Sequence, residues 1–243
     1  CDEIGFHLAE DFYWFNPAKL PSPIEWVNKR KIRVKDSVNT VWWFSKTEFP
    51  KADVKKVLVP YSERMKKLID DPESFYKPKK RPSGHDISAS FGKDNGGAIP
   101  SNLLPIPNTD SNSTYLRLSK ELGLECHPAR FPSELPAFFI NMLTDEGDIV
   151  LDIFAGSNTT GFTAEALNRK WLAFELNQEY LASSVFRFLE GQSVEAVKEI
   201  LGKLQDSHAD YLLRDAHCSL GPAKPVKPER APNGQAAFRL PSG

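Results

Sequence analysis

The stretch DIVLDIFAGSNTTG, residues 148–161, decides the fold of this chain. Its first half is apolar and β-branched, and its second half is a run of small residues that leads into a helix-forming segment. This order predicts a buried strand, then a tight loop, then a helix. Such a layout typically holds a nucleotide-like ligand, because main-chain N–H groups at the start of the helix can face it.

Three ligand classes compete for this loop. A P-loop for phosphates fits the spacing of Gly156 and Gly161, but Phe162 and Thr163 follow where that pattern needs Lys and Ser/Thr. The dinucleotide pattern G-x-G-x-x-G has Asn158 in place of its middle glycine, whose missing side chain lets a pyrophosphate approach. S-adenosylmethionine (AdoMet) carries no phosphate, so it does not need that approach.

Glu175 ends the next predicted strand, 19 residues after Gly156. A carboxylate at this place accepts hydrogen bonds from ribose hydroxyls, and its charge also suits a ligand with a positive sulfonium. The pattern therefore favours AdoMet. An ordinary strand–turn–helix corner, capped by the neighbouring Ser and Thr residues, stays open as the alternative.

Helices and strands alternate over the second half of the chain, which predicts a parallel sheet with right-handed crossovers. Near the start, residues 4–16 predict the end of a helix followed by an aromatic-rich strand that stops at Asn16, and residues 38–46 predict a second strand. A short amphipathic segment is expected near 62–70. The elements expected later are helices over 113–123, 135–144, 160–168, 178–190 and 194–204 and strands over 148–155 and 171–176.

Length and composition fit one sizeable α/β domain with an insertion, or two small domains. The 243 residues hold no apolar run long enough to cross a bilayer, and no leader-like segment opens them. The cysteines, Cys1, Cys126 and Cys218, form neither a metal spacing nor a disulfide framework. These features favour a reducing cytosol and no metal site.

Charge is divided unevenly, although the formal net charge is −1. Residues 19–93 hold 18 Lys and Arg against 9 Asp and Glu, whereas the remainder holds 13 against 23. This division predicts a basic segment that contacts nucleic acid beside an acidic part that binds a small ligand. A solvated basic face without a partner is the alternative.

Two segments resemble motifs of the DNA amino-methyltransferases. DIFAGSNTTG is similar to their DPF-x-G-SG-TT motif, and HPARFPSELPAFFINMLT is similar to the H-P-x-x-x-P segment that packs on the methionine end of AdoMet. The longer stretches DFYWFNPAKLPSPIEWVN, RPSGHDI and NGGAIP resemble the cytosine-N4 methyltransferases of Pvu-type restriction–modification systems. The resemblance covers roughly residues 4–190.

The resemblance implies an α/β fold of the AdoMet-dependent methyltransferase (Rossmann-like) type, with a mixed, incomplete sheet and the permuted β-type order of motifs. Residues 1–50 would be a partial catalytic subdomain, 51–112 an inserted, loop-rich target-recognition region, and 113–205 the AdoMet-binding subdomain. The resemblance does not extend to residues 206–243, whose Pro-, Gly- and Ala-rich composition predicts a disordered tail.

The resemblance also implies AdoMet as the cofactor and double-stranded DNA as the partner. Basic side chains would contact phosphates, and polar ones would reach base edges, although a flexible basic loop without base contacts stays open. The expected DNA-binding residues are Lys31, Arg33, Lys79, Lys80, Arg81, Ser83 and His85. The expected cofactor-binding residues are Ala129, Arg130, Phe131, Asp152, Phe154, Ala155, Gly156, Ser157, Asn158, Thr159, Thr160 and Glu175.

One motif of these enzymes is absent from the sequence. Their [SDN]-P-P-[YFW] loop hydrogen-bonds the exocyclic amine of a flipped base and stacks on it. The nearest tetrapeptide, residues 22–25, lacks the second proline and the aromatic residue. We therefore expect a chain truncated at its N-terminus that is inactive alone and whose catalytic residues cannot be assigned. A degenerate relative that only binds is the alternative.

The function implied by resemblance is methyl transfer from AdoMet to N4 of a flipped cytosine in a short palindrome, with CAGCTG the first candidate. A restriction endonuclease of the same specificity would be the system partner, in the cytoplasm of a prokaryote, with no membrane and no metal involved. Adenine-N6 methylation on the same scaffold, or a non-catalytic module that binds AdoMet or DNA, remains the alternative.

Overall fold

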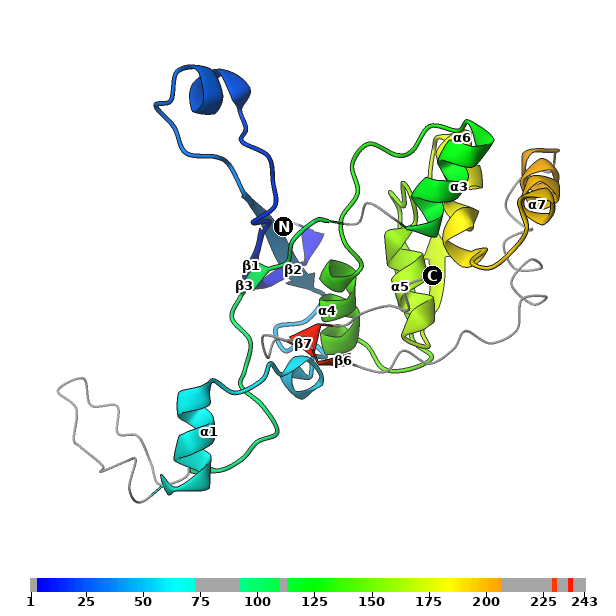
Figure 1. Cartoon of the computed structure of the whole chain (residues 1–243). Coiled ribbons are helices and arrows are strands. Elements are labelled where there is room, and N and C mark those ends of the chain that lie inside the picture. Colours follow the sequence, from blue (N-terminus) through cyan, green and yellow to red (C-terminus); the bar gives the residue numbers. More distant parts are fainter. Residues whose placement is uncertain (1–3, 73–91, 110–112, 207–228, 231–235, 238–243) are drawn as a thin grey trace.

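The computed structural model describes residues 4–72, 92–109, 113–206, 229–230 and 236–237. They form three small sheets, two of which lie on either side of a central helix, α4 (Glu134–Leu143). Figure 1 shows the first sheet at the start of the chain and the second among the later helices. The expected α/β class with an incomplete sheet is therefore confirmed.

The first sheet is mixed and has the strand order β2-β1-β3. Strands β1 (His7–Phe15) and β2 (Val38–Ser45) pair antiparallel, as their aromatic and β-branched residues predict. Strand β3 (Leu103–Pro105) joins β1 in parallel. It was not predicted, because a three-residue strand that ends in proline has no periodicity to detect.

The described parts of the connections between these strands contain three short elements, one between β1 and β2 and two between β2 and β3. They are the π-helical turn η2 (Glu25–Lys29), the 3-10 turn η3 (Val54–Val57) and helix α1 (Glu63–Asp70). The amphipathic segment predicted near 62–70 is thus confirmed, and the hydroxyl of Ser62 caps α1 by accepting from the N–H of Met65 at 3.2 Å.

The second sheet has two strands, β4 (Ile149–Asp152) and β5 (Lys170–Ala173), which run parallel as predicted. Helix α5 (Thr159–Ala166) connects them and packs on both. The remaining elements are α3 (Thr114–Leu122), α6 (Gln178–Ser184), η5 (Val185–Phe188), α7 (Val194–Asp206) and the paired strands β6 (Glu229–Arg230) and β7 (Ala236–Ala237).

Two apolar clusters hold these elements together. The sheet core joins β1, β3 and η3 to α4, where Phe12 meets the rings of Phe138 and Phe139 edge-to-face at 5.8 and 5.1 Å. The helical core joins α3, α6, η5 and α7. Its buried members are Tyr115, Leu118, Ala182, Val185, Phe186, Leu189, Val197, Leu201 and Leu204.

The prediction that the strand at 148–155 is buried is wrong. Val150 faces the packed side, but Ile149 and Leu151 are 62% and 57% exposed, and Leu172 beside Leu151 in β5 is 49% exposed. The strand is apolar as predicted. Helix α5 covers one face of this sheet, but no described element covers the other face. Parallel strands are normally covered on both faces, so this face is unusual.

Helix α7 is the longest helix among the described residues, and neither it nor any other described helix has the length and apolar content of a membrane span.

Candidate functional site

The loop after β4 is fastened to the end of β5. The N–H of Phe174 donates to the carbonyl of Asp152 at 2.8 Å, and the N–H of Ala155 donates to the carbonyl of Phe174 at 2.9 Å. The carboxylate of Asp152 also accepts from the N–H of Phe154 at 3.0 Å. These bonds place the loop at the carboxyl ends of two parallel strands, where ligands bind in open α/β sheets.

Gly156 is required at the centre of the loop. Its φ is +54°, and a Cβ added there would lie 3.2 Å from the ring of His127. That ring packs edge-on against Tyr180 at 4.8 Å, and its Nδ1 lies 2.8 Å from the carbonyl oxygen of Ala129. The H-P segment therefore lies directly against the loop, and His127 fixes its position.

Glu175 connects the loop to the turn after β5. Its carboxylate accepts from the N–H of Gly156 at 2.8 Å and from the N–H of Asn177 at 2.9 Å. Burial opposes ionisation, but these two hydrogen bonds and the nearby His127 together hold the pKa of Glu175 below its ordinary value. A carboxylate has about four lone-pair sites, so it can still accept from the two hydroxyls of a ribose.

Asn158 begins helix α5 in the left-handed region, at φ +54°. It is 1% exposed, and its Oδ1 accepts from the N–H of Gly161 at 3.1 Å. Its Oδ1 is thus occupied in capping the helix. The main-chain N–H donates to the carbonyl of Ala155 and the main-chain carbonyl accepts from the N–H of Phe162, whereas Nδ2 has no partner among the described residues. A contact between this residue and a ligand stays a prediction.

A buried arginine that the sequence analysis missed supports the loop from below. Arg187, on η5, donates to both the carbonyl and the hydroxyl of Ser157 and lies over the ring of Tyr115. Tyr115 in turn accepts from the N–H of His127 at 2.9 Å. An arginine inside the apolar run SSVFRFL is the sequence signal that could have indicated it, because charged side chains are seldom buried without partners.

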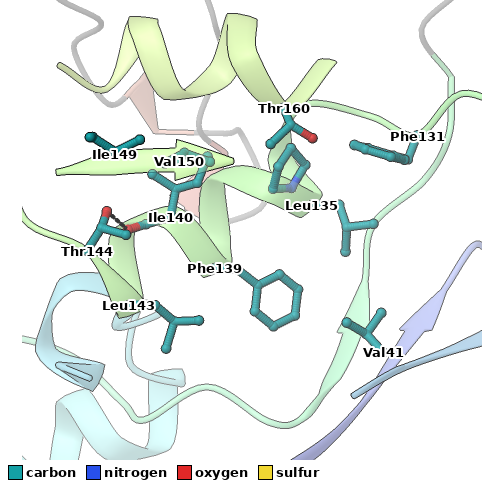
Figure 2. A pocket seen from close by; sticks show the side chains of 11 residues that line it. Val41, Phe131, Leu135, Phe139, Ile140, Leu143, Thr144, Ile149, Val150 and Thr160 are labelled. Carbon is teal, nitrogen blue, oxygen red and sulfur yellow. Dashed lines mark hydrogen bonds between the residues drawn. The ribbon is translucent and has the colours of Figure 1, made fainter. Parts of the chain in front are cut away.

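An apolar pocket of about 360 Å³ lies between the two sheets (Figure 2). Val41 of β2, Phe139 of α4 and Val150 of β4 line it from three sides. Two residues predicted to bind the cofactor, Phe131 and Thr160, also line it, whereas Gly156 and Glu175 do not. The pocket therefore adjoins the loop site but is not the same cavity.

The predicted cofactor residues are brought together in part. Ala129 and Gly156 lie against His127, and Glu175 is hydrogen-bonded to Gly156. Ser157 and Thr159 place their hydroxyl oxygens 3.3 Å apart in the buried base of the loop. Arg130 instead turns back on its own segment, where its guanidinium donates to the carbonyl of His127 at 2.5 Å. Phe154 is 80% exposed at the end of β4.

The predicted DNA contacts fall into two groups. Lys31 and Arg33 are exposed on the connection between β1 and β2. Lys79, Lys80, Arg81, Ser83 and His85 lie outside the described residues, so their part of the prediction stays a prediction. In the described part of the chain, no group of three or more His, Cys, Asp or Glu side chains could hold a metal ion.

Comparison with known proteins gives the following similarities. Residues 1–186 match the N6_N4_Mtase family model, described as DNA methylase. Type II methyltransferase M.PvuII of Proteus hauseri is 66% identical over 204 residues, which are 84% of this chain and 61% of that protein. Orphan methyltransferase M.BamHII of Bacillus amyloliquefaciens is 32% identical over 127 residues, 46% of this chain and 44% of that protein.

A solved structure, PvuII DNA methyltransferase (cytosine-N4-specific), is similar to the fold. The TM-score is 0.65 at 52% identity, over 84% of this chain and 59% of that one. This similarity confirms the methyltransferase type of α/β fold that the sequence predicts. The chain spans about three fifths of the length of M.PvuII.

Proposed function

The chain belongs to the N6/N4 DNA methylase family, and from this membership we propose that it is the AdoMet-binding and DNA-binding part of a cytosine-N4 DNA methyltransferase. The observation that carries the proposal is the hydrogen bond between Gly156 and Glu175, which fixes a charged carboxylate beside the loop after β4. The 66% identity to M.PvuII supports cytosine N4 as the methylated atom.

AdoMet fits the residues at this site. The carboxylate of Glu175 would accept from the ribose hydroxyls, and the loop from Ala155 to Thr160, in which Gly156 packs against the ring of His127, would lie beside the ligand. The segment from Ala129 to Phe131 lies against the loop and would hold the methionine end. When bound, AdoMet supplies an electrophilic methyl group on a positive sulfonium.

The acceptor of the methyl group would be the exocyclic amine of a cytosine flipped out of double-stranded DNA. That amine needs hydrogen-bond acceptors to become nucleophilic, and the [SDN]-P-P-[YFW] loop that provides them in the family does not occur in these 243 residues. We therefore infer that the chain alone binds both ligands without transferring methyl. Its system partner would be a restriction endonuclease of the same specificity, in the bacterial cytoplasm.

Calorimetric titration with AdoMet tests the site. Glu175→Ala is expected to weaken binding by about 1–3 kcal/mol, because charge-assisted hydrogen bonds to the ribose are lost. Glu179→Ala is the matched control, since it removes an exposed carboxylate four residues away in the first turn of α6. Equal affinity of wild type and Glu175→Ala, or no binding by the wild type, would contradict the proposal.

A chimera tests the reaction itself. The part of M.PvuII that this chain does not match is joined to residues 1–205 in the order of that relative, and the product is incubated with AdoMet and a CAGCTG duplex. Nucleoside mass spectrometry is expected to find N4-methylcytosine with the chimera and none with the chain alone. N6-methyladenine in the same digest would move the assignment to the adenine enzymes.

A further inference from the structure

The connection between β1 and β2, residues 17–37, stands away from the rest of the chain and is here called the arm (Figure 1). Its base is closed by the N–H of Asn16, which donates to the carbonyl of Ser37 at 2.8 Å, and by the N–H of Asp36, which donates to the carbonyl of Ser22 at 2.9 Å. The ammonium of Lys35 ties both limbs together through the carbonyls of Pro17 and Lys19. Hydrogen bonds between its two limbs thus hold the arm in a defined conformation.

Trp26 organises the tip of the arm. Its carbonyl accepts from the N–H groups of Ile32 and Arg33 at 3.1 and 3.3 Å, which folds the returning limb against the π-helical turn. The guanidinium groups of Arg30 and Arg33 lie over its ring, 5.0 and 4.5 Å from the centroid. Stacking holds an arginine in place while its N–H donors stay free at the edge of the plane.

Some basic side chains of the arm have ion-pair or hydrogen-bond partners among the described residues, and others have no ion-pair partner there. Lys29 and Arg30 both pair with Glu25, at 3.3 and 3.0 Å, and Lys35 binds carbonyls of the base. Among the described residues, no carboxylate lies at ion-pair distance from Lys31 or Arg33. Both are exposed. Two cations without an ion-pair partner among the described residues, separated by Ile32, therefore lie at the tip.

We propose that the arm is a clamp for the DNA backbone, in which Lys31 and Arg33 contact phosphates and Trp26 is the residue that positions Arg33. This inference rests on the proposed function, because it takes DNA as the substrate. The planar guanidinium of Arg33 can donate two parallel hydrogen bonds to one phosphate, and the ammonium of Lys31 supplies a second point of contact. The exposed Ile24 and Ile32 make an anionic membrane the competing partner, which the experiment includes.

Fluorescence anisotropy of a labelled 30-base-pair duplex, titrated with the full 243-residue chain at several salt concentrations, tests the clamp. Lys31→Gln and Arg33→Gln should each reduce the slope of log affinity against log salt by about 1, and each should weaken binding about fivefold at 0.15 M salt. Lys29→Gln is the matched control: it removes the same charge from the same arm, but from an ammonium that is paired with Glu25, a carboxylate that Arg30 shares.

Trp26 is tested by a conservative pair of variants. Trp26→Leu should weaken DNA binding as much as Arg33→Gln does, and should weaken it little further when combined with Arg33→Gln. Trp26→Phe keeps an aromatic face for the guanidinium and should restore most of the affinity. If Trp26→Leu fails to fold, the Arg33→Gln and Trp26→Phe results still decide the matter.

Three outcomes overturn the clamp. The first is equal loss with Lys29→Gln, Lys31→Gln and Arg33→Gln, which would indicate charge alone. The second is wild-type affinity in all three variants. The third is binding to phosphatidylserine vesicles that depends on Lys31 and Arg33 while DNA is not bound. AdoMet affinity, measured in parallel, separates the two proposals: if it is retained, only the clamp fails, whereas loss of both AdoMet and DNA binding in the wild type removes the proposed function as well.

Discussion

The guanidinium of Arg187 donates two hydrogen bonds to Ser157, from Nε to the main-chain carbonyl at 2.6 Å and from Nη2 to Oγ at 2.9 Å. Arg187 is 6% exposed and comes from η5, whereas Ser157 belongs to the loop after β4. The loop at the candidate cofactor site is therefore held by a residue 30 positions further along the chain, and its shape depends on the packing of the helical core.

Replacing Arg187 should damage both stability and cofactor binding. Hydrogen bonds to a charged group contribute about 1.5–3 kcal/mol each, so we expect Arg187→Ala to lower the free energy of unfolding by about 3 kcal/mol and to weaken AdoMet binding. Arg187→Lys keeps the positive charge but not the planar set of guanidinium donors, so its losses of stability and of AdoMet affinity should be smaller than those of Arg187→Ala but not zero. Urea unfolding and calorimetry measure the two effects. Arg117→Ala, which removes an exposed arginine paired with Glu121, is the control and should change little.

The exposed face of the second sheet should make the chain self-associate. Leu151 and Leu172 are register partners on that face, and an apolar patch of this kind attracts other surfaces. Replacing both with Thr keeps the strand propensity and should lower dye binding and the weight-average mass in sedimentation. Val150→Thr, on the packed face, should instead lower stability and leave association as it is. If the double variant still associates, the surface responsible for self-association is not the face that carries Leu151 and Leu172.

Local signals predicted most of the elements. Helix α3 is bracketed by Ser113 and by Gly123, which takes φ +69°, and both residue types are frequent at those positions. The loop after β4 and the acidic end of β5 were predicted for the same reason: each depends on residues close in sequence. The hydrogen bond between Gly156 and Glu175 then follows from the parallel pairing of the two strands.

Features that depend on distant partners were not predictable. Strand β3 exists because Leu103, Leu104 and Pro105 pair with Tyr13, Trp14 and Phe15, some 90 residues earlier. The exposure of Leu151 depends on which elements are present to cover its face, and an apolar strand sequence carries no such information. Of the five basic residues at 29–35, the sequence could not tell which would be engaged, because that depends on where Glu25 and the two limbs of the arm lie.

Acid should release the contact between the segment after β2 and the turn before β4. Lys51 bridges Asp145 and Asp148 at 2.6 and 2.7 Å, and Lys56 also pairs with Asp145. Hydrogen bonds from Lys51 and Lys56 lower the pKa of Asp145 to about 2. A carboxyl whose pKa is lower in the folded state stabilises the fold above its unfolded pKa of about 3.9, and this contribution is lost as the pH falls toward 2.

Asp145→Asn should therefore be less stable than the wild type at pH 7, and most of the difference should be lost by pH 2. The effect should be modest and should shrink in high salt, because all of these side chains are exposed to solvent. Urea unfolding across the pH range measures it. Glu146→Gln removes a carboxylate from the same turn without an ion-pair partner among the described residues, and should show no such dependence. A difference that is as large at pH 2 as at pH 7 would mean that the ion pairs are not its cause.

The effects of substitutions at Asn158 and Gly161 on stability should depend on each other, because the Asn158 side chain fills the space beside Gly161. A double-mutant cycle measures this coupling. A Cβ on Gly161 would lie 2.3 Å from Oδ1 of Asn158, so Gly161→Ala must displace the cap of α5 and should cost about 1–2 kcal/mol of stability. Asn158→Gly keeps the left-handed backbone at φ +54° and should cost only a few tenths of a kcal/mol. In the double variant the clash is gone, and alanine is the better helix former by about 1 kcal/mol. The double variant should then be at least as stable as Asn158→Gly alone, by urea unfolding. Additive losses, with the double variant the least stable of the four proteins, would show that the two residues do not meet.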